Sequence, residues 1–216
     1  QRGFQVYKEV CSACHSLNLV SFHDLGDAGG LAFSDAQIKA LAASYKIPAG
    51  PNDKGETTDA SGNPLMRPGI PADHFPPPFA NEQAARAANG GALPPDLSLI
   101  VKAREGGPQY VYSIVTGDST KAPAGFHLTP NKYYDPYFPG RNISMPPPLT
   151  DGQVTFSDGS PNKLADEAHD VVAFLSWAAE PKMDERKQLG FGVMAFLLLL
   201  SGLLFLSYRR IWKDAH

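Results

Sequence analysis

Cysteine is scarce in this sequence, which limits what its thiols can do. Cys11 and Cys14 are the only two cysteines among 216 residues, and His15 follows them in the pentapeptide CSACH. A structural zinc site needs four ligands, usually from a second CxxC pair or from two histidines three to five residues apart. There is no third cysteine, and no two histidines have that spacing; they are His15, His23, His74, His127, His169 and His216. The sequence therefore argues against a zinc site at CSACH.

A regular alternation of strands and helices is also missing. A thioredoxin-like redox dithiol places its CxxC at the end of a strand in a βαβ unit. Here the motif continues a helical pattern, since Phe4, Tyr7, Cys11 and Cys14 are spaced by three and four residues. A redox dithiol is therefore not favoured, and a disulfide between the two thiols remains open only for the chain before a cofactor is attached.

Charge of either sign is modest and unevenly distributed. Charged residues are 19% of the chain, and the formal net charge is −3. Residues 181–216 contain six Lys/Arg and three Asp/Glu, which leaves 13 Lys/Arg and 19 Asp/Glu for residues 1–180. Nucleic-acid binding needs a basic surface, so we expect no nucleic-acid partner. The acidic part favours a basic protein partner, unless its charge serves solubility alone.

Charge is completely absent from LGFGVMAFLLLLSGLLFLSY, residues 189–208. At about 1.5 Å per residue, a helix of this length spans roughly 30 Å, the thickness of a bilayer core. We therefore predict one transmembrane helix, with Tyr208 and Trp212 at the interface. Three Lys/Arg lie close on each side of the run, so the charge rule does not decide its orientation.

The residues before this span are rich in glycine and proline, with 20 of each in the whole chain. The strongest helical pattern is SPNKLADEAHDVVAFLSWAAEP, in which Ser160 can cap the helix, Pro161 suits its first position and Pro181 marks its exit. Its apolar positions fall on one face: Leu164, Ala168, Val171, Val172, Leu175 and Ala179.

Further helices are predicted at the N-terminus and over residues 35–45 and 82–89. Residues 96–104 and 110–117 fit helix or strand, and we favour helix because few segments offer strand partners. The predicted fold is therefore mainly α, with long loops over residues 46–81, 117–150 and 151–161. Such long loops are usually functional or wrapped around something.

C-x-x-C-H is the attachment motif of c-type haem. Thiols one helical turn apart can add to the two vinyl groups on one porphyrin edge, and the next residue then points its imidazole at the iron. The motif thus predicts one covalent haem c, with thioethers at Cys11 and Cys14 and an axial ligand at His15. Because this attachment generally occurs outside the cytoplasm, the haem-bearing part is expected on the periplasmic side, or in the intermembrane space if the source is mitochondrial.

An electron-transfer haem needs a second strong axial ligand, usually Met or His. Met145 is favoured, because Pro146, Pro147 and Pro148 stiffen the chain directly after it. It also lies just before the predicted helix of residues 160–181. The alternatives are Met66 and four histidines: His23, His74, His127 and His169.

Several longer stretches resemble the cytochrome c1 family, whose members are the haem-bearing subunits of ubiquinol–cytochrome c reductase. The matching stretches are RGFQVYKEVCSACHS, PNDKGE, MRPG, EQAARAANGGALPPDLSLIVKAREGG, YVYSIVTG, YDPYFPG, MPPPL and DVVAFLSWAAEP. The resemblance implies a class I cytochrome c-like haem domain with one C-terminal transmembrane helix. The family has a further segment before RGFQVY, so we expect this chain to be a trimmed form.

The resemblance also implies specific cofactor contacts. It gives His15 and Met145 as the iron ligands and Cys11 and Cys14 as the attachment points. Arg104, with Tyr110 nearby, is expected to contact a haem propionate, which fits the need of a buried carboxylate for a cation or hydrogen bonds. Asn89 and the turn of Ala92, Leu93, Pro94 and Pro95 are expected to line the haem edge.

The expected organisation is an extracytoplasmic c-type haem domain over residues 1–181, a membrane-proximal linker over 182–188, an anchor helix over 189–208 and a cytoplasmic or matrix tail over 209–216. The resemblance implies that the chain sits in the inner membrane beside cytochrome b and the Rieske iron–sulfur protein, in a dimeric complex. It would pass one electron from the Rieske protein to a c-type cytochrome, as the electron-transfer subunit of a quinol–cytochrome c reductase with no substrate chemistry of its own.

Two other functions stay open from the sequence. The chain could be another membrane-anchored monohaem cytochrome c that feeds an oxidase or a dehydrogenase. It could also be a haem-based gas sensor, which would need an open or labile sixth iron position.

Overall fold

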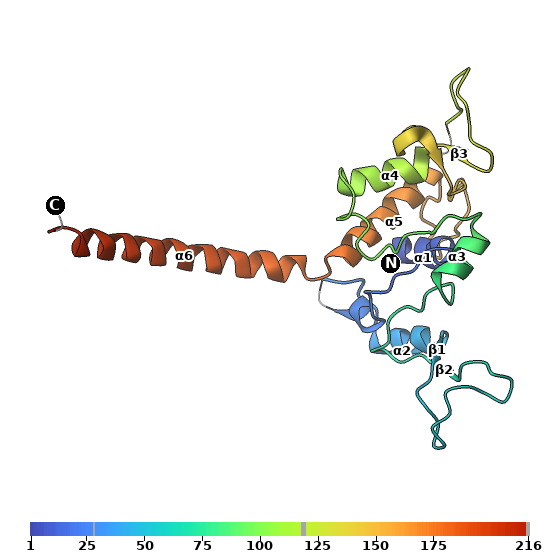
Figure 1. Ribbon diagram of the computed structural model, residues 1–216, viewed down its shortest axis with the longest axis horizontal. Coiled ribbons are helices and arrows are strands. Elements are labelled where there is room, and N and C mark those ends of the chain that lie inside the picture. The colour runs from blue at the N-terminus through green and yellow to red at the C-terminus, as the bar shows by residue number, and fades with distance from the viewer. Residues whose placement is uncertain (28, 118–119, 215–216) are drawn as a thin grey trace. The chain divides into compact units, whose positions relative to one another are not determined.

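The computed structural model describes residues 1–27, 29–117 and 120–214, which form two compact units, Gln1–Glu180 and Pro181–His216 (Figure 1). The prediction of a mainly α fold is confirmed. The described residues form these α-helices: α1 (Arg2–Glu9), α2 (Asp35–Ala43), α3 (Glu82–Ala88), α4 (Gly107–Gly117), α5 (Leu164–Ala179) and α6 (Met183–Ile211). Short 3₁₀ turns lie at η1 (Cys11–Ala13), η2 (His23–Gly26) and η3 (Pro139–Arg141).

Helices α1 and α5 form the centre of the first unit and pack directly against each other (Figure 1). Gly3 makes this approach possible, because a Cβ there would lie 1.9 Å from the Asp170 carbonyl oxygen. The rings of Phe4 and Phe174 meet edge to face, 5.6 Å apart. The most deeply buried apolar side chains gather around this contact: Val6, Leu17, Phe22, Leu25, Val154 and Val171. Burial of apolar area stabilises this core.

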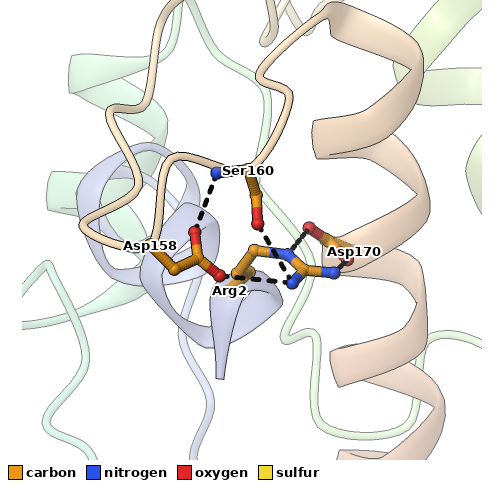
Figure 2. Close-up of polar contacts among 4 residues, drawn as sticks. All are labelled: Arg2, Asp158, Ser160 and Asp170. Carbon is orange, nitrogen blue, oxygen red and sulfur yellow. Dashed lines mark hydrogen bonds and ion pairs between the residues drawn. The ribbon is translucent and has the colours of Figure 1, made fainter.

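A polar cluster ties the start of α1 to α5 and to the loop before it (Figure 2). Arg2 Nε donates to Asp170 Oδ2 at 2.7 Å, and Arg2 Nη2 donates to Asp170 Oδ1 at 3.2 Å. The same guanidinium reaches Ser160 Oγ at 3.4 Å and Asp158 Oδ2 at 3.5 Å. Since the Arg2 side chain is exposed, its ion pairs contribute little to stability.

Two short antiparallel ribbons interrupt the long loops. Strand β1 (Lys46–Pro48) pairs with β2 (Met66–Pro68), and β3 (Tyr133–Tyr134) pairs with β4 (Asn142–Ile143). The sequence did not predict these ribbons, because strands of two or three residues are too short to show a hydrophobic period.

The helix expected over residues 160–181 begins later than predicted. Its first residue is Leu164 and its N-cap is Lys163, so the expected cap at Ser160 and the helical Pro161 are wrong. Asn162 is bound to the preceding loop instead, since its carbonyl accepts from Gly152 N at 2.7 Å and its Nδ2 donates to the Val154 carbonyl at 3.1 Å. The predicted apolar face is confirmed, with Ala168, Val171, Val172, Leu175 and Ala179 buried and Leu164 partly buried.

The favoured helix over residues 96–104 is also wrong, because this stretch forms turns. The Asp96 carboxylate accepts hydrogen bonds from Ser98 N at 2.9 Å and Asn18 N at 2.9 Å, which fixes a non-helical backbone. The other helices expected in the first unit are present as α1, α2, α3 and α4. Cys11 and Cys14 lie beyond the end of α1, so only the first part of the N-terminal pattern is α-helical.

The second unit consists mainly of α6, a helix of 29 residues whose apolar window is not buried by any part of the described chain. Its length and composition fit a membrane anchor. Residues 183–188, expected as a linker, are helical and continue into the expected span 189–208. Of the expected tail, residues 215–216 lie outside the described residues.

Candidate functional site

The CSACH motif forms a tight turn at the end of α1. Val10 N closes the helix on the Val6 carbonyl at 2.9 Å, and the chain then enters η1. The Cys11 carbonyl accepts from both Cys14 N at 3.1 Å and His15 N at 2.9 Å. The backbone of the motif therefore turns tightly around the Cys11 carbonyl oxygen.

The two thiols differ in their surroundings, and both are free of a disulfide. Cys11 packs against the core, whereas Cys14 is exposed. Burial, and secondarily the neighbouring Cys14, raises the pKa of Cys11 to about 12. Cys11 is therefore a protonated thiol at neutral pH, unlike the thiolate of a redox-active or zinc-binding cysteine.

His15 is held in one tautomer by the backbone of a distant loop. Its Nδ1 lies 2.8 Å from the Pro95 carbonyl oxygen, which can only accept, so Nδ1 carries the proton. Burial lowers the pKa of His15, although the Pro95 carbonyl and the nearby Asp96 oppose this shift. The ring is therefore neutral, and the lone pair of Nε2 is available for a metal, as in most metal-binding histidines.

The loop that supplies Pro95 is fixed to the segment after CSACH. Leu97 N donates to the Ser16 carbonyl at 2.9 Å, and Ser16 Oγ donates to Asp96 Oδ2 at 2.7 Å. Ser98 is fully buried, and its Oγ accepts from Leu19 N at 3.1 Å. Sequence reasoning missed Asp96 and Ser98, although an Asp two residues before a Ser, after two prolines, is typical of such a turn.

Hydrogen bonds also control the charge of Asp96. Burial alone would raise its pKa, but the hydrogen bonds from Ser98, Asn18 and Ser16 together lower the pKa below its ordinary value. The carboxylate is therefore ionised at neutral pH and contributes to the local field that acts on His15.

Met145 lies directly after the β3–β4 ribbon, on an irregular segment. Its side chain is half-buried, and Leu149, four residues later, is almost completely buried. Lys132 Nζ donates to Ser144 Oγ, so the residue before Met145 is tied to the opposite side of the ribbon. The three prolines after Met145 lie outside helices and strands. Met145 is thus presented on a segment that is fixed on both sides.

The other predicted cofactor residues occupy nearby loops and helix ends. Arg104 is exposed, with Nη1 donating to the Ala103 carbonyl at 3.0 Å, and Tyr110 is half-buried on α4. Asn89 ends α3 and donates from Nδ2 to the Ala85 carbonyl at 2.7 Å. Ala92 and Pro94 are half-buried, while Leu93 is exposed.

Among the described side-chain hydrogen bonds, the one between His15 and Pro95 is the one that directly joins two predicted cofactor residues. A pocket of about 840 Å³ lies beside α1 and α5, but the described residues that line it include neither the CSACH cysteines nor Met145. The candidate site is therefore defined by its donor groups rather than by this pocket.

The donor set fits haem c better than a free metal ion. CSACH offers two unpaired thiols and a neutral imidazole with a fixed proton. A thioether suits haem iron, whereas zinc sites use cysteine, histidine and carboxylate ligands. His23, Asp24 and Asp27 also cluster near the surface, without a partner from the CSACH region.

Comparison with known proteins gives one consistent family. Residues 1–215 match the model of the Cytochrome C1 family. The chain is 49% identical over 234 residues to "Cytochrome b/c1" of Bradyrhizobium diazoefficiens, covering 100% of this chain and 33% of that protein. It is 48% identical over 229 residues to "Cytochrome c1" of Rhodospirillum rubrum, covering 99% of this chain and 80% of that protein.

The chain is also similar to a mitochondrial protein. The chain is 48% identical over 211 residues to "Cytochrome c1 1, heme protein, mitochondrial" of Arabidopsis thaliana, covering 98% of this chain and 65% of that protein. The chain thus spans about a third of the Bradyrhizobium diazoefficiens protein, 80% of the Rhodospirillum rubrum protein and 65% of the Arabidopsis thaliana protein.

Proposed function

This chain belongs to the cytochrome c1 family, and we propose that it is the haem-bearing electron-transfer subunit of a cytochrome bc1 complex. The observation that carries this proposal is the fixed tautomer of His15 within CSACH, because it leaves Nε2 ready to bind iron. When bound, haem c supplies one-electron chemistry between Fe(III) and Fe(II).

The residues of CSACH hold the cofactor from one side. Cys11 and Cys14 would hold the porphyrin through their sulfur atoms, and His15 would hold the iron through Nε2. The Pro95 carbonyl accepts a hydrogen bond from Nδ1–H and so fixes the ring orientation and raises the basicity of the ligand. The covalent links keep the cofactor in place when the chain opens locally.

Met145 would hold the iron together with His15. A thioether stabilises the reduced iron and raises the reduction potential, and two protein ligands keep oxygen from the metal. Arg104 neutralises a propionate with help from Tyr110, while Asn89, Ala92, Pro94 and Pro95 line the edge. These residues bind and orient the cofactor, and none of them has to exchange a proton with a substrate.

The proposed electron path runs between proteins. The Rieske iron–sulfur protein delivers one electron near the haem edge, and a c-type cytochrome accepts it. Cytochrome b is the membrane neighbour, the complex is dimeric, and the haem domain lies on the periplasmic or intermembrane-space side of the membrane, anchored by α6. The acidic residues of 1–180 attract a basic acceptor, an effect that weakens with salt.

The test is a redox-titrated visible spectrum of the detergent-purified protein with its co-purifying subunits. The proposal expects a c-type spectrum, companion b haems, and a far-red methionine–iron charge-transfer band in the oxidised form. Met145→Leu should abolish that band, while Met66→Leu, a matched change on strand β2, should leave it intact.

Two outcomes of this experiment would contradict the proposal. A band that persists in Met145→Leu would show that another residue binds the iron. Purification without b haems and a Rieske protein would instead indicate a different anchored cytochrome c, one that serves an oxidase or a dehydrogenase.

A further inference from the structure

Two carboxylic acids are completely buried in the part of the chain that the structure describes, and both flank the segment that carries Met145. Asp135 and Glu167 each have 0% of their surface exposed. Acidic residues are almost never fully buried unless they are paired. Yet one oxygen of each, Asp135 Oδ2 and Glu167 Oε2, has no hydrogen-bond partner among the described protein atoms. Burying them is costly, so their position calls for a compensating role.

Asp135 fixes the start of the Met145 segment. Its Oδ1 accepts from Tyr137 N at 2.8 Å, which closes the turn between β3 and η3. Its own backbone N donates to the Arg141 carbonyl at 3.4 Å, and its carbonyl accepts from Phe138 N at 3.3 Å. The carboxyl therefore organises the turn from which β4 runs into Met145.

This turn packs directly against Gly117, the last residue of α4. A Cβ at Gly117 would lie 2.7 Å from Asp135 Oδ1 and 2.9 Å from Tyr137 Cδ2. Such distances leave no room for a side chain, so glycine allows the buried carboxyl to rest against the helix end. The turn is thus fixed by contact with α4 as well as by its own hydrogen bonds.

Glu167 fixes the other end of the same segment. It lies in the first turn of α5, and its Oε1 accepts from Val154 N at 2.9 Å. Asp151 Oδ1 accepts from Leu164 N at 2.8 Å, in the same turn of the helix. The chain after the three prolines is therefore bound to the start of α5.

We propose that Asp135 and Glu167 are positioning residues for the axial methionine: each holds one end of the segment that carries Met145, and together they set the strength of the sulfur–iron bond. This inference rests on the proposed function, in which Met145 is the ligand. A thioether is a weak ligand, so the sulfur–iron bond is stronger when the segment that carries Met145 loses less conformational freedom on forming it. Releasing either end increases that loss.

Both acids act through an accepting oxygen rather than through charge. Burial raises the pKa of Asp135 and of Glu167 from the ordinary value of each side chain, although hydrogen bonds from the backbone partly oppose the shift. An amide of the same shape keeps the accepting oxygen and needs no ionisation. Asp135→Asn and Glu167→Gln should therefore preserve the position of Met145, whereas Asp135→Ala and Glu167→Ala should not.

The experiment measures how readily imidazole displaces Met145 in the oxidised, haem-loaded full chain in detergent. Loss of the far-red band gives the imidazole dissociation constant, and a redox titration gives the potential. We expect each alanine variant to lower that constant about tenfold, which corresponds to about 1.4 kcal/mol. The potential should also fall, since a weaker thioether stabilises the reduced iron less. The amide variants should remain within about twofold of the wild type.

The matched control is Asp73→Ala. Asp73 also closes a turn, accepting from Ile70 N at 2.8 Å, and it pairs with Arg67, but it lies outside the Met145 segment. This variant should melt at a lower temperature without changing the imidazole constant. If Asp73→Ala lowered the imidazole dissociation constant as much as the other alanine variants do, the effect would be general destabilisation and the proposal would be overturned. The proposal would also be overturned if Asp135→Ala and Glu167→Ala bound imidazole like the wild type.

A second variant covers the case in which Asp135→Ala yields no holoprotein. Gly117→Ala keeps the acid but displaces the turn from α4, and it should lower the imidazole constant in the same direction. A wild-type protein without the far-red band would instead refute Met145 as the ligand, and so would count against the proposed function rather than against the positioning alone.

Discussion

Asp96 offers the sharpest test of how the His15 side of the site is held. Its carboxylate accepts from Ser16 Oγ at 2.7 Å, Asn18 N at 2.9 Å and Ser98 N at 2.9 Å. These contacts fix the loop whose Pro95 carbonyl orients His15. Replacing Asp96 with alanine removes both acceptor oxygens, and with them all three hydrogen bonds.

The expected loss follows from the burial of the donors. Ser98 is fully buried, so its N–H stays without a partner and costs about 1–3 kcal/mol. The Asn18 N–H is exposed and can turn to water, and the Ser16 hydroxyl is half-buried, so these two contacts add about 0.5–1 kcal/mol each. We expect Asp96→Ala to lower the free energy of unfolding by about 3 kcal/mol, which is roughly 6–12 °C in melting temperature for a chain of this size.

The assay is thermal unfolding of the haem-loaded full chain in detergent, followed by haem absorbance, with Asp53→Ala as the control. Asp53 is an exposed acid in the loop between β1 and β2, and its removal should change stability by less than about 0.5 kcal/mol. If Asp96→Ala melts within 1 °C of this control, the loop does not depend on the carboxylate and the reasoning is refuted.

The same comparison has a predicted pH dependence. The pKa of folded Asp96 is lowered relative to its unfolded value near 3.8. A carboxyl with a lowered folded pKa contributes its full stability above the unfolded pKa and loses it as the pH falls through the folded pKa. The difference between wild type and Asp96→Ala should therefore be constant from about pH 5 to 7 and shrink below about pH 4.

Three further predictions concern the helices. Gly3→Ala should lower the melting temperature by more than 10 °C, since its Cβ would lie 1.9 Å from the Asp170 carbonyl; circular dichroism measures it. Arg2→Ala should lower the melting temperature slightly, and less in high salt, because its ion pairs are exposed. Leu199→Arg on α6 should reduce the fraction that resists alkaline carbonate extraction, whereas Leu199→Ala should not.

The sequence predicted those elements whose signal is a hydrophobic period. Helices α1, α2, α3 and α5 follow apolar residues at helical spacing, and α6 follows an uninterrupted apolar run. The pattern of α4 fits helix or strand, and helix is favoured there only because few segments offer strand partners. Errors arose where a side chain competes with the backbone: Asp96 replaced an expected helix with a turn, and Asn162 delayed the start of α5.

The candidate site divides in a similar way. CSACH is visible because its chemistry depends on side chains at a fixed spacing. The partner of His15 is a backbone carbonyl 80 residues away, so the type of side chain at position 95 does not indicate this hydrogen bond. Any residue could present that carbonyl, so sequence reasoning found Pro95 only through the family resemblance.

A single local motif connects both sides of the proposed haem site. Asp96 accepts from the N–H of Ser98, and Asp135 accepts from the N–H of Tyr137, so each acid closes a turn on the residue two positions later. Asn52 forms the same turn with Lys54, but there both residues are exposed. Exposed turns of this kind can exchange their hydrogen bonds with water at little cost.

Burial therefore separates the two classes of turn. A turn in which one of the two partners is fully buried, as Ser98 and Asp135 are, favours one conformation, because each alternative leaves a buried polar group without a partner. The loop that orients His15 and the segment that carries Met145 each contain such a turn, and neither relies on a strand ladder of more than two residues. The two carboxylates thus fix loops that contain little regular secondary structure. Replacing Asp96 should disrupt only the turn that orients His15, and replacing Asp135 should disrupt only the turn before Met145.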